Sequence, residues 1–132
     1  MATRFREYIT KNGTLFLAGK DAVTNEELIS QVEPNEDVFH TKEPGSPFVN
    51  IKGEPKTNDV KEAAIFCAAH SRVWKKNKID LEIHKFKGHD IYKEKGMSLG
   101  TFGVKNFKVI KIKKKEIEKW QESQTSNLEN KD

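Results

Sequence analysis

The stretch NDVKEAAIFCAAHSRVWKK, residues 58–76, decides the fold because it is the clearest helix in a chain otherwise rich in short strands. Asp59 and Glu62 are spaced as a capping box at its start, and Lys75 and Lys76 suit the negative end of the helix dipole. One face carries mostly small or apolar side chains at steps of three and four residues: Val60, Ala63, Ala64, Cys67, Ser71 and Trp74. Such a face is expected to pack closely on a sheet.

The segments around this helix are strands joined by turns. REYIT and TLFLAG flank Asn12-Gly13, a pair that favours a two-residue hairpin turn. Apolar residues alternate with polar ones in IDLEIHKF, which predicts a half-buried strand. Further strands are predicted in DVFHT, PFVNIKG, TFGV and NFKVIKI, and two more helices in KDAVTNEELISQV and KKEIEKWQE.

The order of these elements is hairpin, helix, strands, long helix, strands and short helix, and it lacks the βαβ alternation of a parallel sheet. It predicts an α+β fold with a mainly antiparallel sheet and helices packed on one face. The length of 132 residues suits a single domain, which we place at residues 1–120. Residues 121–132 are polar and are expected to form a disordered tail.

Charge is distributed unevenly along the chain. Residues 1–66 hold 8 basic and 11 acidic side chains, whereas residues 67–132 hold 16 and 9. A basic half favours a polyanionic partner such as nucleic acid, although a solvated lysine-rich surface gives the same pattern. The basic candidates are Arg72, Lys75, Lys76, Lys85, Lys87, Lys105, Lys108, Lys111 and Lys113.

The composition of the chain gives an expectation for its cellular location. The sequence has no apolar run of the roughly 18 residues that a membrane span needs, and its first residues have no apolar signal core. Its single cysteine, Cys67, lies in the apolar helical pattern and reads as a small buried side chain. We therefore expect a cytoplasmic protein that does not act at a membrane.

Four segments, taken together and in this order, carry a family resemblance: GKDAVTNEEL (19–28), DVFHTKEPGS (37–46), AAIFCAAHSRVW (63–74) and LGTFGVKNFKVIKI (99–112). Within roughly residues 5–115 the chain resembles the NFACT-R domain, which occurs in the large NFACT proteins of ribosome-associated quality control and as small stand-alone proteins. One departure is the segment FKGHDIYKEKGMSLG, which has no proline where the family usually carries a Lys-Pro-x-Gly type loop.

The resemblance implies a stand-alone RNA-binding module. Its expected partner is structured RNA, either tRNA or rRNA, including rRNA of the large ribosomal subunit. The rest of the large NFACT proteins is not in this sequence, so the chain is not expected to elongate stalled peptides itself. Oligomeric state and the identity of the RNA are left open.

The candidate RNA-binding residues come from these segments and from the basic half: Lys20, Asp21, Asn25, His40, Gly45, Ser46, Arg72, Lys75, Lys76, Lys105, Lys111 and Lys113. Amides at a turn or at a helix N-terminus can meet phosphate oxygens, and a histidine can stack on a base. Each motif residue also has a structural alternative. In that alternative Asp21 or Asn25 caps local backbone and His40 fixes its loop by a hydrogen bond across the sheet.

Two other classes of function compete with RNA binding. The sequence has no GxGxxG, P-loop or HExxH motif, and its histidines and Cys67 lack metal-ligand spacing, so we expect no enzyme, no metal and no cofactor. Asp37 and His40 alternate to opposite faces of a predicted strand, which disfavours an acid–base pair and hence a hydrolase. The remaining alternative is a protein-interaction or assembly factor that docks on a ribosomal or translation partner.

Overall fold

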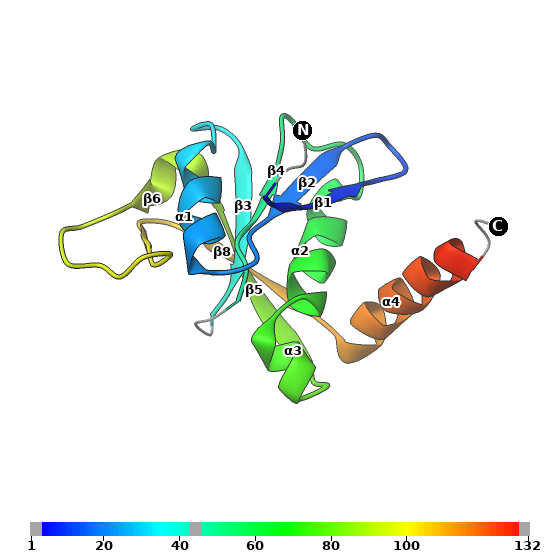
Figure 1. Cartoon of the computed structure of the whole chain (residues 1–132). Coiled ribbons are helices and arrows are strands. Elements are labelled where there is room, and N and C mark those ends of the chain that lie inside the picture. Colours follow the sequence, from blue (N-terminus) through cyan, green and yellow to red (C-terminus); the bar gives the residue numbers. More distant parts are fainter. Residues whose placement is uncertain (1–3, 43–45, 130–132) are drawn as a thin grey trace.

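A computed structural model describes residues 4–42 and 46–129, with side chains in the last helix to residue 125 (Figure 1). It confirms the α+β class and the mainly antiparallel sheet. The main sheet has the strand order β1-β2-β4-β3-β5-β8, and every pair is antiparallel. Its strands are β1 (Arg6–Ile9), β2 (Leu15–Ala18), β3 (Asp37–Thr41), β4 (Val49–Ile51), β5 (Leu81–Lys87) and β8 (Lys108–Ile112).

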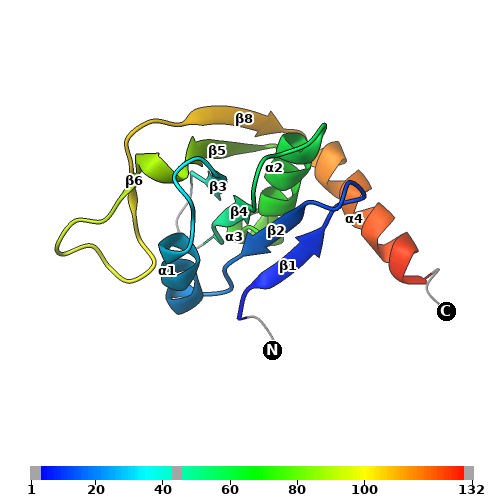
Figure 2. The same ribbon diagram turned by 90° about the horizontal axis from the view of Figure 1, so that it is seen from above.

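Helices cover both faces of this sheet, because its central strands are apolar on both sides. On one face Phe16, Phe39 and Ile83 pack against α2 (Asp59–Ala69) and its neighbours. On the other face Leu17, Val38 and Phe86 pack against Leu28 of α1 (Ala22–Ser30). Figure 2 shows α1 and α2 on opposite sides of the sheet. The prediction of helices on one face holds for α2 and the two helices after it, but not for α1.

The long predicted helix is in fact two helices. α2 ends at Ala69, and α3 (Arg72–Lys76) starts after Ser71. The Ser71 hydroxyl donates to the Ala68 carbonyl at 2.7 Å and accepts the Trp74 amide at 3.1 Å, so it ends one helix and caps the next. Trp74 is 1 % exposed, as expected for a core residue.

The predicted capping box at the start of α2 is wrong. Asn58 occupies the N-cap with a positive φ of 72° and makes no side-chain cap. The Asp59 carboxylate instead accepts the Thr14 hydroxyl and the Lys56 amide at 2.5 and 2.7 Å. Glu62 does not reach back to the N-cap but accepts hydrogen bonds from Tyr8 and Trp120. Asp59 therefore ties α2 to the first hairpin.

The first hairpin forms as predicted, but with a longer turn. Thr10 N–H donates to the Thr14 carbonyl, and Gly13 N–H donates to the Thr10 carbonyl, each at 2.9 Å. Gly13 has a φ of +84°, whereas Asn12 is not among the positive-φ residues of the described chain. The turn is thus a three-residue loop that needs a left-handed conformation only at Gly13.

The last helix, α4 (Lys114–Glu129), closes one end of the core. Ile117 is fully buried against α2, and the Trp120 ring packs edge-on against Phe66. Glu62 of α2 accepts hydrogen bonds from Trp120 Nε1 at 3.1 Å and from the Tyr8 hydroxyl at 2.7 Å, which joins β1, α2 and α4. The terminal helix is predicted correctly, but it continues to Glu129, where the sequence predicts a disordered tail from residue 121.

A small second sheet flanks α1. It pairs β6 (Ile91–Tyr92) with β7 (Gly103–Val104), after a 3₁₀ turn, η1 (Gly88–Asp90). The loop between β6 and β7 projects beside α1 in Figure 1. Within the described part of the chain, no helix has the length and apolar character needed to cross a membrane.

Candidate nucleic-acid interface

A cleft of about 850 Å³ opens where α1, α3 and the β6–β7 loop meet the α1-side face of the sheet. Its volume is within the range of ligand-binding sites. Five cationic side chains and one carboxylate, that of Asp21, line it. The cations come from β1, the turn before α1, the loop after β3, and α3: Arg6, Lys20, Lys42, Arg72 and Lys75.

These five cations are not neutralised by the described part of the protein. None of them has a carboxylate within 4.0 Å among the described ion pairs. Two lysines outside the cleft differ: Lys85 and Lys87 approach Asp37 Oδ1 at 3.5 and 2.8 Å, and Asp37 is almost fully buried. The cleft therefore concentrates positive charge that is available to an anionic ligand.

The Gly19 and Asn25 pair builds the floor of the cleft. Asn25 Oδ1 accepts the Phe48 amide at 3.3 Å, and Gly19 N–H donates to the Phe48 carbonyl at 3.1 Å. A Cβ on Gly19 would lie 1.9 Å from Asn25 Oδ1, so only glycine leaves room for this side chain. Asn25 is thus a structural residue that joins α1 to Phe48, directly before β4, while the local cap that the sequence allowed at Asp21 or Asn25 is made by Asp21.

Asp21 and Thr24 form a capping box at the start of α1. Asp21 Oδ1 accepts the Thr24 amide at 2.8 Å, and Thr24 Oγ1 accepts the amides of Lys20 and Asp21 at 2.7 and 3.0 Å. These two amides are therefore already engaged within the turn before α1. The exposed Lys20 side chain remains available at the rim of the cleft.

His40 and Ser46 fasten the loop between β3 and β4. His40 Nε2 donates to the Ser46 carbonyl at 3.0 Å, and Ser46 Oγ accepts the Arg72 amide at 3.4 Å. Ser46 is 2 % exposed, so its contribution to the cleft is mainly to hold α3 beside this loop. Gly45, the other turn candidate, lies outside the described residues.

Hydrogen bonds to Glu26 hold the β6–β7 loop in place as one wall of the cleft. Glu26 of α1 accepts hydrogen bonds from Lys93 Nζ at 3.0 Å and from the Gly100 amide at 2.7 Å. Gly100 has a φ of +78°, and a Cβ there would lie 2.8 Å from the Ala22 backbone. Lys93 Nζ also lies 4.6 Å from the centre of the Phe102 ring, which lines the cleft.

Aromatic rings form the base of the cleft between these walls. His40 stacks on Phe48 with ring centres 4.1 Å apart, and His84 stacks on Phe107 at 4.2 Å. His40 and His84 are opposite each other in the β3–β5 register, so the two stacks are neighbours on one face. Phe107 is 50 % exposed, unlike the buried Phe48.

The histidines of the cleft are held neutral. Burial lowers the pKa of His70 to about 4, and the charges of Arg6 and Lys75 act in the same direction. Burial also lowers the pKa of His40, against the effect of its hydrogen bond to Ser46, and the pKa of His84. At neutral pH the positive charge of the cleft therefore resides on its lysines and arginines.

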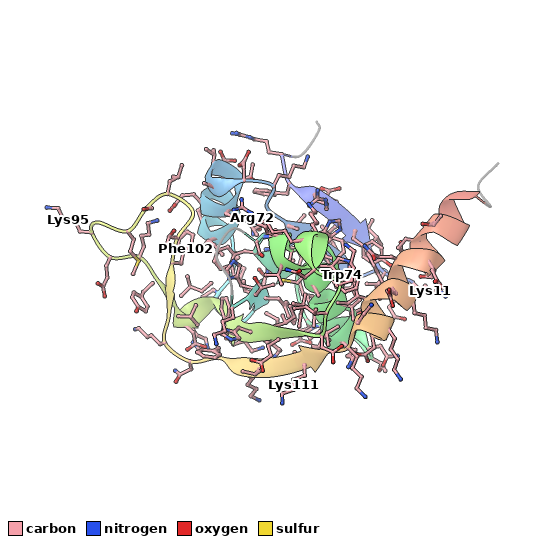
Figure 3. All side chains as sticks on the ribbon, turned by 90° about the horizontal axis from the view of Figure 1, so that it is seen from below. Lys11, Arg72, Trp74, Lys95, Phe102 and Lys111 are labelled. Carbon is pink, nitrogen blue, oxygen red and sulfur yellow. The ribbon has the colours of Figure 1, made fainter. Side chains whose placement is uncertain are left out.

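The structure brings together seven of the predicted residues: Lys20, Asp21, Asn25, His40, Ser46, Arg72 and Lys75 line the cleft. The other four described candidates, Lys76, Lys105, Lys111 and Lys113, are exposed and do not line it. Lys111 pairs across the strands with Glu82, and Figure 3 shows it on the outer strand β8, apart from Arg72 and Phe102.

Sequence reasoning missed several residues of the cleft. Arg6 and Lys42 are isolated basic residues in the acidic half of the chain, and only their placement in the fold brings them to Arg72 and Lys75. His84 and Phe107 lie in predicted strands where alternation gave them no special role. Among the described residues, no group of three or more His, Cys, Asp or Glu is arranged to hold a metal ion.

The family is shown by a direct match. Residues 4–106, most of the chain, match the family model described as the NFACT protein RNA binding domain. The chain belongs to this family. The match covers every residue that lines the cleft except Phe107, which follows it by one position.

One known protein is similar to this chain in sequence, and another is similar in fold. The archaeal Rqc2 homolog aRqcH of Methanocaldococcus jannaschii is 46% identical in an alignment of 68 residues that covers 48% of this chain and 10% of that protein. The C-terminal part of the fibronectin/fibrinogen-binding protein from Streptococcus suis has the same fold, with a TM-score of 0.75 and 20% identity over 90% of this chain and 49% of that one. This chain therefore spans about a tenth of the curated relative that it matches.

Proposed function

We propose that this chain binds structured RNA, tRNA or rRNA, through the cationic cleft, in the cytoplasm and in a translation or ribosome quality-control context. The observation that carries the proposal is the set of five cationic side chains, without ion pairs among the described residues, around one cleft with an aromatic base. When cationic side chains bind phosphates, counterions are released from the RNA, and bases can stack on aromatic rings. Both features match RNA better than a small anion.

The family supports the RNA part of this proposal, since its domain is named for RNA binding. The ribosome quality-control context rests on the archaeal relative, which is described as an Rqc2 homolog. Since this chain corresponds to a tenth of that relative, the proposal extends to RNA binding by this domain and not to the activity of the whole relative.

The site is proposed to bind and not to catalyse. Cys67 is fully buried, and its burial raises the pKa of the thiol, which disfavours the thiolate needed for attack. His40 is engaged by the Ser46 carbonyl, while Asp37 is held by Lys85 and Lys87. The Cys67 thiol is thus buried, and the Asp37–His40 pair weighed in the sequence is committed to structural contacts.

A charge-reversal experiment tests the proposal. The variant Arg72→Glu with Lys75→Glu changes two cleft cations, and the variant Lys111→Glu with Lys113→Glu makes the same change in net charge outside the cleft. Filter binding to tRNA and to an rRNA fragment should show at least a tenfold, roughly estimated, loss of affinity for the first variant and a much smaller loss for the second.

Circular dichroism melts of both variants serve as the control, since all four side chains are exposed and the fold should survive. Equal losses of affinity in the two variants would show that total charge and not the cleft determines binding. Unchanged affinity in the cleft variant would refute the proposal.

Docking on a protein is the second candidate function, because β8 is an edge strand of the main sheet and carries Val109 at 47 % exposure. An exposed edge can add a strand from a partner. Lysines along the same strand at 108 and 111 oppose this, since charged edges resist strand addition. Capture of a ribosomal or translation partner that survives nuclease treatment would favour docking, and loss of every partner after nuclease would favour RNA.

A further inference from the structure

Phe107 is the most exposed aromatic ring of the cleft. Its side chain is 50 % exposed, whereas Phe48 and Phe86, on the same base, are 5 % and 4 % exposed. One of its faces is covered by the His84 ring, at a centroid distance of 4.2 Å and an interplanar angle of 16°. Because that face is covered, the exposed area belongs to the opposite face and the ring edge.

The ring is held in place although it is exposed. His84 lies within the seven-residue strand β5, paired with His40 on one side and Val109 on the other. The half-exposed Phe107 directly precedes β8, whose register with β5 fixes it beside His84. A flat apolar face is therefore presented at the cleft with little freedom left to lose on binding.

The surroundings of this ring determine what it can accept. Leu99, 55 % exposed, and Phe102 stand on the wall made by the β6–β7 loop, and both line the same cleft as Phe107. The five cations described above line it as well. A ligand that fills this cleft thus meets a flat apolar surface and a cluster of positive charge together.

We infer that the Phe107 ring, backed by His84, is a stacking platform for one unpaired base of the bound RNA. The inference rests on the proposed function and names the structural class of RNA: a strand with a bulged, looped or terminal nucleotide. Each base has an apolar face that stacks on an aromatic ring, while the adjoining phosphates meet the cations. In a continuous duplex both faces of each internal base are already stacked, so the platform has no internal base to receive.

Two RNAs that differ by a single nucleotide test this inference. The first is a continuous duplex of about 16 base pairs, the length that a double-stranded RNA-binding domain spans, with both ends closed by non-nucleotide linkers so that it presents no bulged, looped or overhanging base. The second is the same RNA with one bulged 2-aminopurine at its centre. The protein should bind the bulged RNA roughly tenfold more tightly, and 2-aminopurine fluorescence should fall on binding as the base stacks.

Variants separate the stacking platform from charge. Phe107→Ala should remove the preference for the bulged RNA and the fluorescence change, and Phe107→Tyr should keep both, because its ring stacks as well. Val109→Ala is the matched control, since Val109 is 47 % exposed, lies opposite His84 and does not line the cleft. Thermal melts verify that each variant is folded.

The outcomes distinguish this inference from the proposed function. If the parent protein binds the two RNAs equally, or if Phe107→Ala keeps the preference, the stacking platform is refuted. RNA binding through the cleft then still stands, provided that Arg72→Glu with Lys75→Glu weakens binding to both RNAs. If that charge reversal leaves both affinities unchanged, the proposed function itself fails.

Discussion

Replacing Gly19 by alanine is expected to destabilise the protein through its neighbour Asn25. The backbone of Gly19 is not in the positive-φ region, so alanine adopts it without strain. The added Cβ would instead lie 1.9 Å from Asn25 Oδ1 and 2.8 Å from Asn25 Cγ. Since real Cβ atoms do not approach this closely, the Asn25 side chain must leave, and the Phe48 amide loses its acceptor.

The magnitude follows from that lost hydrogen bond. Phe48 is 5 % exposed, so its amide has little access to water once Asn25 has moved. An unsatisfied buried amide costs about 1–3 kcal/mol, and we expect the free energy of unfolding of Gly19→Ala to fall by about 2 kcal/mol. For a domain of this size that corresponds to a decrease in Tm of roughly 6–12 °C.

A double-mutant cycle measured by urea unfolding tests this mechanism. Asn25→Ala removes the same acceptor and should cost about as much as Gly19→Ala. Once Asn25 is alanine the close contact with Oδ1 no longer exists, so adding Gly19→Ala should cost little more. The two changes should therefore be non-additive by about 1–2 kcal/mol. Additive losses would refute the reasoning, because the glycine would then be required for a reason unrelated to Asn25.

Two further predictions concern charge. If all five cleft cations meet phosphates, a plot of log affinity for RNA against log salt concentration should have a slope of about −3.5 to −4.5. In a filter-binding series, Lys42→Gln should reduce the magnitude of that slope by about 0.7–0.9, whereas Lys111→Gln should leave it unchanged. Stability should fall as pH decreases from about 6.5 toward 4, because burial lowers the pKa of His70 to about 4 in the folded protein while the unfolded chain takes up a proton near pH 6.5. Urea unfolding at pH 7 and pH 5 measures this effect in the parent protein and in His70→Gln. Between these pH values the free energy of unfolding should decrease by about 1 kcal/mol less in His70→Gln than in the parent, after allowance for the partial exposure of His70. An identical decrease in both proteins would contradict the assignment to His70.

Local patterns predicted the strands well and the helix ends poorly. Alternation in residues 79–86 and the Asn12-Gly13 pair identify β5 and the hairpin, since both signals arise from neighbouring residues. The three- and four-residue periodicity predicted one helix through Ser71. A serine ends one helix and caps the next only where its hydroxyl can bond to backbone groups of both helices. Ser71 finds them in the Ala68 carbonyl and the Trp74 amide. That choice depends on three-dimensional packing, which periodicity does not contain.

The sequence points to those cleft residues that belong to a short motif or to a run of basic residues. Lys20, His40, Arg72 and Lys75 belong to short motifs or basic runs, and they line the cleft. Lys111 and Lys113, which the sequence predicts as RNA-binding residues from their charge density, do not line the cleft, because β8 and the residue after it lie at the edge of the sheet. The location of a cation relative to a cleft is set by topology, which a count of lysines does not report.

The motif residues and the ligand-facing residues of this cleft have different physical roles. Asn25, Ser46 and Ser71 have side chains that bond to the chain itself and are at most 9 % exposed, so they build the cleft. Arg6 lies outside the four segments and Lys42 lies within one of them, but the sequence predicted neither as a binding residue, and neither has an ion pair among the described residues. Substitution of a motif residue should therefore lower stability and affinity together, whereas substitution of a free cation should lower affinity alone. The motifs thus identify the scaffold of the site, and the cations on its walls that have no ion pair among the described residues form the surface that we propose contacts RNA.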